Sequence, residues 1–162
     1  MFGLGKKKQE LVSDDKLYSP LTGKVIELST VSDPVFAKKI MGDGFAVEPT
    51  DRQIVSPVAG TVTVKQGHAV GFQRADGLEI LLHLGIDTVS LNGAPFKLKV
   101  NVGDIVKGGD NIGQADWSKV DEAGLPKTTM VLVTNTADKL DQLSVKYDET
   151  SAGAEVGQAT AK

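Results

Sequence analysis

His68 and His83 are the two histidines of this chain, and their type and spacing could support chemistry. A neutral imidazole can act as a base, bind a metal or attack with a ring nitrogen. The chain has no cysteine, so a thiol nucleophile and thiolate zinc ligands are excluded. If the two rings lie close together, one could accept a phosphoryl group while the other holds that group by a hydrogen bond.

His83 lies in a segment that has the pattern of a strand with one buried face. The even positions of residues 78–86 are all apolar, and this period of two places His83 on the opposite face. Residues 67–74 also read as a strand. Between the two segments stands Asp76-Gly77, which is typical of a two-residue hairpin turn.

Such a turn predicts a register in which the two histidines share a face. The predicted pairs are Arg74 with Glu79, Phe72 with Leu81, Val70 with His83, and His68 with Gly85. The opposite charges of Arg74 and Glu79 favour this register. The histidines would then be diagonal neighbours, about 7 to 8 Å apart at the backbone. A slip of one residue would place them on opposite faces.

Short β-type segments separated by Gly, Pro, Asn and Asp follow one another from Tyr18 onward. The frame Ser-Pro-x-x-Gly-x-Val occurs at 19–25 and again at 56–62, which indicates a duplicated strand-turn-strand unit. Two segments, 32–42 and 116–124, carry the start and stop signals of short helices. The sequence therefore predicts an all-β fold, a sandwich or barrel, with one or two short helices.

Composition restricts the functional class further. The 162 residues are 40% hydrophobic and 24% charged, as is typical of one globular domain. The net charge of -3 gives no general attraction to nucleic acid, and we expect none as a partner. No apolar run approaches the roughly 20 residues that span a bilayer, so we expect a cytoplasmic protein.

We expect three parts along the chain. Residues 1–17 read as a flexible basic tail, in which Phe2, Leu4 and the lysines at 6–8 could contact an anionic membrane surface weakly. Residues 18–147 read as the folded domain. Residues 148–162 have little β-type pattern, and we expect them to be poorly ordered or loosely paired.

Four segments together resemble the glucose-family enzyme IIA of the bacterial phosphoenolpyruvate-dependent sugar phosphotransferase system. They are residues 77–93 with their Leu-His-Leu-Gly-Ile-Asp-Thr-Val block, the pair His68-Ala69, residues 33–44 and residues 56–60. The resemblance covers residues 18–147 and implies an antiparallel β-sandwich or barrel-like duplicated motif. It also implies a phosphotransferase component without a cofactor or metal.

The same resemblance implies partners and residue roles. Phosphate would come from the histidine-containing phosphocarrier protein to Nε2 of His83, with His68 orienting it, and would leave for the IIB domain of a membrane sugar transporter. The unphosphorylated form would bind regulated transporters or metabolic enzymes, and we expect a monomer. Gln66 stands where relatives often carry a threonine that orients a ring, and its amide could serve instead. The residues implied to contact partners are Asp33, Val35, Phe36, Leu81 and Asp87.

Two alternatives remain open at this level. A zinc peptidase on a related scaffold would need three protein ligands, whereas His83-x-x-x-Asp87 supplies half of the expected motif. A non-catalytic carrier module is suggested by the turns of residues 102–110, but these residues lack a lysine in the setting that such carriers present. From the residues alone, Val35 and Phe36 could equally belong to the core or to a docking surface.

Overall fold

The computed structural model describes residues 9–162, and the suggested membrane contact of residues 2–8 lies outside this part. Strands dominate it, and every strand pair is antiparallel, as the sequence analysis predicts. Among residues 9–162, no helix has both the length and the apolar character needed to cross a membrane.

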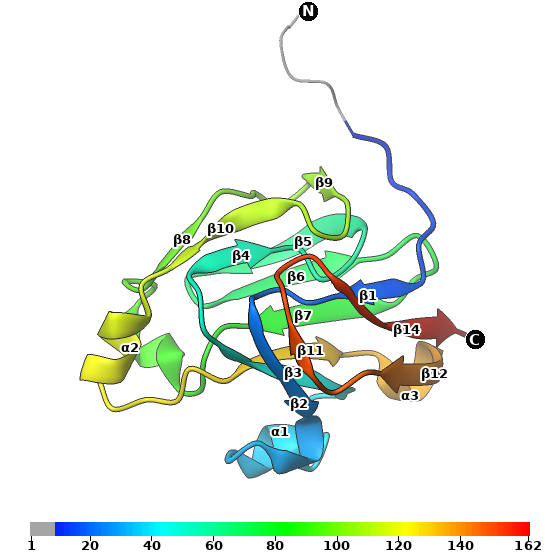
Figure 1. The fold of residues 1–162 in the computed structure, drawn as a ribbon. Helices are drawn as coiled ribbons and strands as arrows, with labels where there is room; N and C mark the ends of the chain where they lie inside the picture. The colour runs from blue at the N-terminus through cyan, green and yellow to red at the C-terminus, as the bar shows by residue number, and fades with distance from the viewer. Residues whose placement is uncertain (1–8) are drawn as a thin grey trace, which may run out of the picture.

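One eight-stranded sheet and two three-stranded sheets make up the described body (Figure 1). The strands of the large sheet, in spatial order, are β13 (Glu149–Thr150), β2 (Gly23–Glu27), β3 (Asp43–Pro49), β11 (Thr129–Val133), β7 (Glu79–His83), β6 (Ala69–Gln73), β5 (Gly60–Gln66) and β9 (Ile105–Val106). One small sheet consists of β1 (Lys16–Tyr18), β14 (Glu155–Ala161) and β12 (Leu140–Val145). The other consists of β4 (Gln53–Val55), β10 (Asn111–Ala115) and β8 (Phe96–Leu98).

The helices of the described chain are all short. They are α1 (Pro34–Ala37), α2 (Trp117–Glu122), α3 (Thr136–Lys139) and the 3-10 turns η1 (Leu28–Thr30) and η2 (Thr88–Leu91). Asp33 caps α1 and Asp116 caps α2, each by accepting a hydrogen bond from a backbone N–H two residues on. The helix predicted over 32–42 is shorter than expected, because Lys39 adopts a left-handed φ of 61° that ends the helical path.

The strand order shows the duplication that the repeated Ser-Pro frame predicts. On either side of the central β11–β7 pair, β3, β2 and β13 correspond to β6, β5 and β9, and each half has its own small sheet. The backbone hydrogen bonds repeat as well. Ser19 bonds to Gly153 and Ala154 through its carbonyl and amide, while Ser56 bonds to Gly109 and Asp110 in the same way. Both serines are fully buried, and each hydroxyl donates to the carbonyl two residues on.

The structure corrects the expected boundaries at both ends. The tail predicted to extend to residue 17 instead enters the fold at Lys16, where β1 pairs with β14. Residues 148–162, predicted to be poorly ordered or loosely paired, include β14, which pairs with β1 on one side and β12 on the other. Val156 and Ala159 of β14 are buried in the main core, and the buried guanidinium of Arg74 donates to the Ala159 carbonyl at 2.7 Å. Small side chains thus pack where the sequence shows little apolar pattern.

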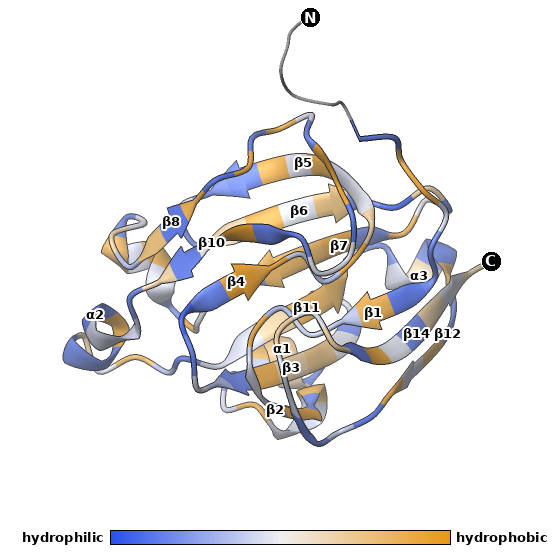
Figure 2. Cartoon of the chain, turned by 45° about the horizontal axis from the view of Figure 1, so that its top comes forward, coloured by the Kyte–Doolittle hydropathy of each residue, from blue (hydrophilic) through white to orange (hydrophobic). Residues whose placement is uncertain are grey.

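The core has two parts, separated by the central strands of the large sheet. The main cluster lies between the large sheet and the small sheets and takes in the even positions of β7; Figure 2 shows the apolar strands that enclose it. The second cluster lies on the other face, and its members are Leu28, Val31, Phe36, Ala46, Ile86, Met130 and Leu132. All five residues of β11 are buried because both faces of this strand are covered. The second cluster includes Phe36 of α1, whose ring packs against His83.

Candidate active site

The two imidazoles lie in contact on the outer face of the large sheet. Their ring centroids are 4.9 Å apart and their planes meet at 76°. His83 ends β7, whereas His68 occupies the turn Gly67-His68 that joins β5 to β6. The predicted meeting of the two rings is therefore present in the structure.

The register that led to this prediction was wrong by one residue. The observed pairs are Gln73 with Glu79 and Ala69 with His83, because the hairpin loop spans Ala75–Gly77 and not Asp76-Gly77 alone. Gly77, at φ 93°, supplies the left-handed residue that three-residue loops of this kind use. Arg74 consequently does not face Glu79.

The rings still meet because His68 lies in a turn, where side chains need not alternate between the two faces. The backbone fixes its place: the carbonyl of His68 accepts a hydrogen bond from the Leu84 N–H at 2.8 Å. That bond brings the turn beside the end of β7.

The ring of His83 is held in one orientation by a backbone carbonyl. Nδ1 of His83 lies 2.8 Å from the Gly85 carbonyl oxygen. A carbonyl can only accept, so Nδ1 carries the hydrogen and Nε2 keeps the free electron pair. Gly85 can turn back in this way because it adopts φ 76°. His83 is thus set up to react through Nε2.

His68 has no such anchor, and Gln66 does not provide one. Gln66 ends β5 with an exposed side chain, and among the described residues no hydrogen bond joins it to either imidazole. His68 is nevertheless buried, with 9% of the residue exposed. Its position comes from the backbone of the turn.

The Phe36 ring packs against His83, and Leu81 lies two residues before His83 on the same face of β7. The Phe36 ring lies 5.0 Å from the His83 ring, and only 7% of the residue is exposed. Leu81 is half-buried and packs on the second cluster. The Phe36 ring lies against the histidine and packs in the second cluster, and its contact with a partner stays a prediction.

The rim of the site combines two carboxylates with exposed apolar side chains. Asp33 caps α1. Asp87 directly precedes η2; its backbone is in the left-handed region and its side chain is exposed. Val35 is 42% exposed, as a docking residue would be. Ile40, Met41 and Val89 are further exposed apolar residues of these loops, and none of them was predicted as a contact residue. The sequence does contain a signal for them. Apolar residues that come directly after a short capped helix or a left-handed turn do not lie on the buried face of a strand, so exposure could have been expected.

Burial lowers the pKa of both imidazoles below the ordinary value. For His83, burial is the largest influence, and the neighbouring His68 acts in the same direction. The hydrogen bond to Gly85 and the charges of Asp33 and Asp87 oppose this lowering without reversing it. For His68, burial alone lowers the pKa. Both rings are therefore neutral at pH 7, as a nitrogen nucleophile requires.

We expect this lowering to make the protein less stable in mild acid. An unfolded histidine has a pKa of about 6.5, so below that pH the unfolded chain binds more protons than the folded one. The stability that the neutral histidines contribute is present above about pH 6.5 and decreases as pH falls toward the lowered folded pKa values. NMR titration of the imidazole signals should give values below 6.5 for both rings. Values at or above 6.5 would contradict this account of the site.

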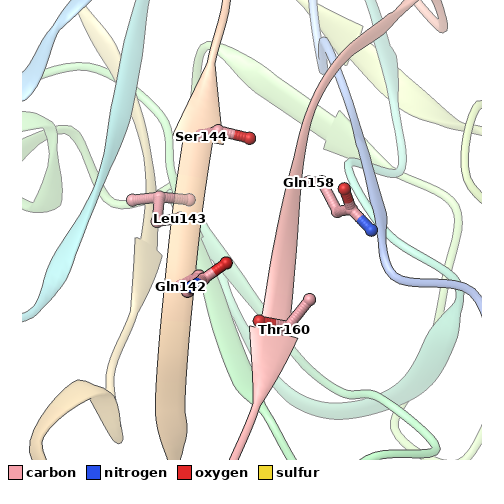
Figure 3. Close-up of a pocket in the computed structure, with 5 residues that line it drawn as sticks. All are labelled: Gln142, Leu143, Ser144, Gln158 and Thr160. Atoms are coloured by element: carbon pink, nitrogen blue, oxygen red, sulfur yellow. The ribbon is translucent and has the colours of Figure 1, made fainter.

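A hollow of about 330 Å³ lies elsewhere, along β12 and β14 of the small sheet (Figure 3). Its lining residues are Gln142, Leu143, Ser144, Gln158 and Thr160, none of which belongs to the histidine site. Residues 9–162 contain no group of three or more His, Cys, Asp or Glu side chains placed to hold a metal ion. The three-ligand set that a zinc peptidase needs is thus not formed by the described residues.

The chain matches the family model described as phosphoenolpyruvate-dependent sugar phosphotransferase system, EIIA 1, over residues 15–139. It is 37% identical to the PTS system glucose-specific EIIA component of Staphylococcus aureus (strain COL) over 153 residues, 93% of this chain and 89% of that protein. It is 46% identical over 140 residues to the PTS system glucose-specific EIICBA component of Streptococcus pneumoniae, covering 85% of this chain and 19% of that longer protein. The solved structure of glucose permease IIA from Mycoplasma capricolum superposes with a TM-score of 0.77 at 36% identity, covering 88% of this chain and 93% of that one.

The fold and the sequence likenesses together define a component of the sugar phosphotransferase system. Within that system, the chain belongs to the glucose-type enzyme IIA family. The family indicated by the residues around His68 and His83 is thereby confirmed.

Proposed function

We propose that this protein carries phosphate on Nε2 of His83 between two partners of the sugar phosphotransferase system. The observation that carries the proposal is the contact between His83 and His68, with the Nδ1 hydrogen of His83 donated to the Gly85 carbonyl. The free electron pair on Nε2 is the nucleophile, and the second imidazole lies where it can hold the transferred group.

The chemistry needs no proton transfer at His83. Nε2 attacks the phosphorus of a phosphohistidine on the donor protein; the new N–P bond forms as the donor's N–P bond breaks, and the donor nitrogen recovers its electron pair. Nδ1 keeps its hydrogen on Gly85 throughout. Such a loose transition state depends mainly on positioning and on stabilisation of the phosphoryl oxygens.

Membership of this family supports the identity of the phosphoryl donor and of the acceptor. The donor is the histidine-containing phosphocarrier protein, and the acceptor is the IIB domain of a glucose-type transporter. The S. pneumoniae relative is named as one EIICBA component, which joins the A part to B and C parts in one chain. We infer that this chain acts at the cytoplasmic side of such a transporter. Asp33 and Asp87 would attract basic partner residues there, and exposed Val35 would supply apolar contact.

The test is a reconstituted relay. Purified protein is incubated with phosphoenolpyruvate, enzyme I and the phosphocarrier protein, and its mass is measured at neutral pH. We expect a gain of one phosphate that is lost in acid, kept in alkali and dependent on the phosphocarrier protein. Adding a glucose-type IIB domain should then discharge it. A protein that stays unphosphorylated in an assay where an established enzyme IIA is labelled would overturn the proposal.

A further inference from the structure

The loop of residues 85–93 contacts both His83 and the turn that carries His68. At its start, the Gly85 carbonyl accepts the hydrogen of His83 Nδ1. At its end, Gly93 packs directly on Gly67, the residue before His68. One loop therefore contacts the ring of one histidine and the backbone turn of the other.

The Gly67–Gly93 contact leaves no room for a side chain. A Cβ atom added to Gly67 would lie 2.6 Å from Gly93 Cα, which is closer than real Cβ contacts. A Cβ atom added to Gly93 would lie 3.0 Å from Gly67 Cα. In both cases the nearest atoms are backbone, which cannot rotate away as a flexible side chain could. Any substitution would therefore push the His68 turn and the loop apart.

The loop is a firm support because it is tied to the core between its two ends. Thr88 is fully buried, and its hydroxyl donates to the Leu84 carbonyl. Leu91 packs against the main hydrophobic cluster. Asn92 and Gly93 both adopt left-handed φ values, of 54° and 78°, which turn the chain so that the Gly93 backbone faces Gly67.

We propose that Gly67 and Gly93 are positioning residues, whose backbone contact sets the distance between the His68 and His83 rings. His68 depends on this support because no hydrogen bond among the described residues reaches its ring, whereas His83 has the Gly85 carbonyl. The inference rests on the proposed function for its effect on phosphate transfer. The placement of the His68 ring can be measured without phosphate.

The experiment compares Gly67→Ala and Gly93→Ala with Gly103→Ala as control. Gly103 also adopts a positive φ, 98°, but a Cβ there meets nothing within 4 Å. The control therefore carries left-handed strain like that of Gly93→Ala without the contact. Gly67→Ala gives the complementary test, since Gly67 is not among the residues with positive φ.

We expect the two contact variants to shift the NMR signals of the unphosphorylated His68 ring and to weaken the cross-peaks between the two rings. Transfer from His83 to a IIB domain should slow by about 10- to 100-fold, as a displacement of about 1 Å can cause. Gly103→Ala should keep wild-type ring signals and transfer. Wild-type His68 signals in both contact variants would overturn the inference. If the wild-type protein carried no phosphate, only the proposed function would fail, because the ring signals still test the contact.

Discussion

Replacing His83 by glutamine should leave a folded protein that cannot be phosphorylated in the relay. The electron pair on the amide nitrogen of glutamine is delocalised into its carbonyl, so this nitrogen is not a nucleophile and no N–P bond forms at this position. Removal of a nucleophile costs catalysis at least about 10³-fold, and we expect no acid-labile phosphate above background. The measurement is intact mass after incubation with phosphoenolpyruvate, enzyme I and the phosphocarrier protein.

A folding control is needed because the His83 ring also packs on Phe36, with the centroids 5.0 Å apart. Losing one tilted aromatic contact costs roughly 1 kcal/mol, which a domain of this size tolerates. Circular dichroism and thermal unfolding of His83→Gln should therefore show a native fold with a modestly lower Tm. If a folded His83→Gln protein still gained one acid-labile phosphate, His83 would not be the acceptor and another nitrogen would have to take its place.

The alternation of apolar residues over 78–86 was enough to predict the strand and the face that carries His83. Burial of even-numbered Leu78, Ile80, Leu82 and Leu84 in the main core confirms it. The repeated Ser-Pro frame likewise predicts the duplication, since each copy makes the same local hydrogen bonds. Signals of this kind succeed because they depend on near neighbours in sequence.

The register was harder to predict, because Asp76-Gly77 fits both a two-residue and a three-residue loop. What decides between them is the pairing of Arg74 with Leu78, together with the burial of Arg74 beneath β14, more than 80 residues later. β14 itself was missed because small residues such as Ala159 carry little hydrophobic pattern. These features depend on contacts between distant parts of the chain.

The contacts that hold the two imidazole rings could not be predicted from a sequence motif either. Gln66 was predicted to orient a ring from its position two residues before His68, yet it is exposed, and no hydrogen bond joins it to either imidazole among the described residues. The hydrogen bond to His83 comes from a carbonyl, and the contact to the His68 turn comes from Gly93. Backbone atoms are the same in every residue, so their use at a site appears only in three dimensions.

His68→Gln should produce a protein that accepts phosphate but passes it on poorly. In the first step the donor protein brings the phosphoryl group with its own contacts, and the electron pair on His83 Nε2 remains available. In the second step the phosphoryl group starts on this chain. Asp33 and Asp87 carry the same sign of charge as phosphate and cannot hold its oxygens. The imidazole of His68, 4.9 Å from His83 between ring centroids, is the group in contact that can donate a hydrogen bond to them.

Loss of one donor that stabilises transition-state charge costs about 10²- to 10³-fold. We therefore expect His68→Gln to reach nearly full phosphorylation given time, and its discharge to a IIB domain to slow by about that factor. The measurement is a single-turnover chase, in which isolated phosphoprotein is mixed with IIB domain and quenched in alkali. Lys65→Gln is a suitable control, because this exposed side chain on the same hairpin bonds Asn101 and not the imidazoles. The two variants change nearby positions of one hairpin, but only Lys65→Gln keeps the second imidazole. If His68→Gln discharged as fast as Lys65→Gln, His83 would transfer its phosphate without help from His68.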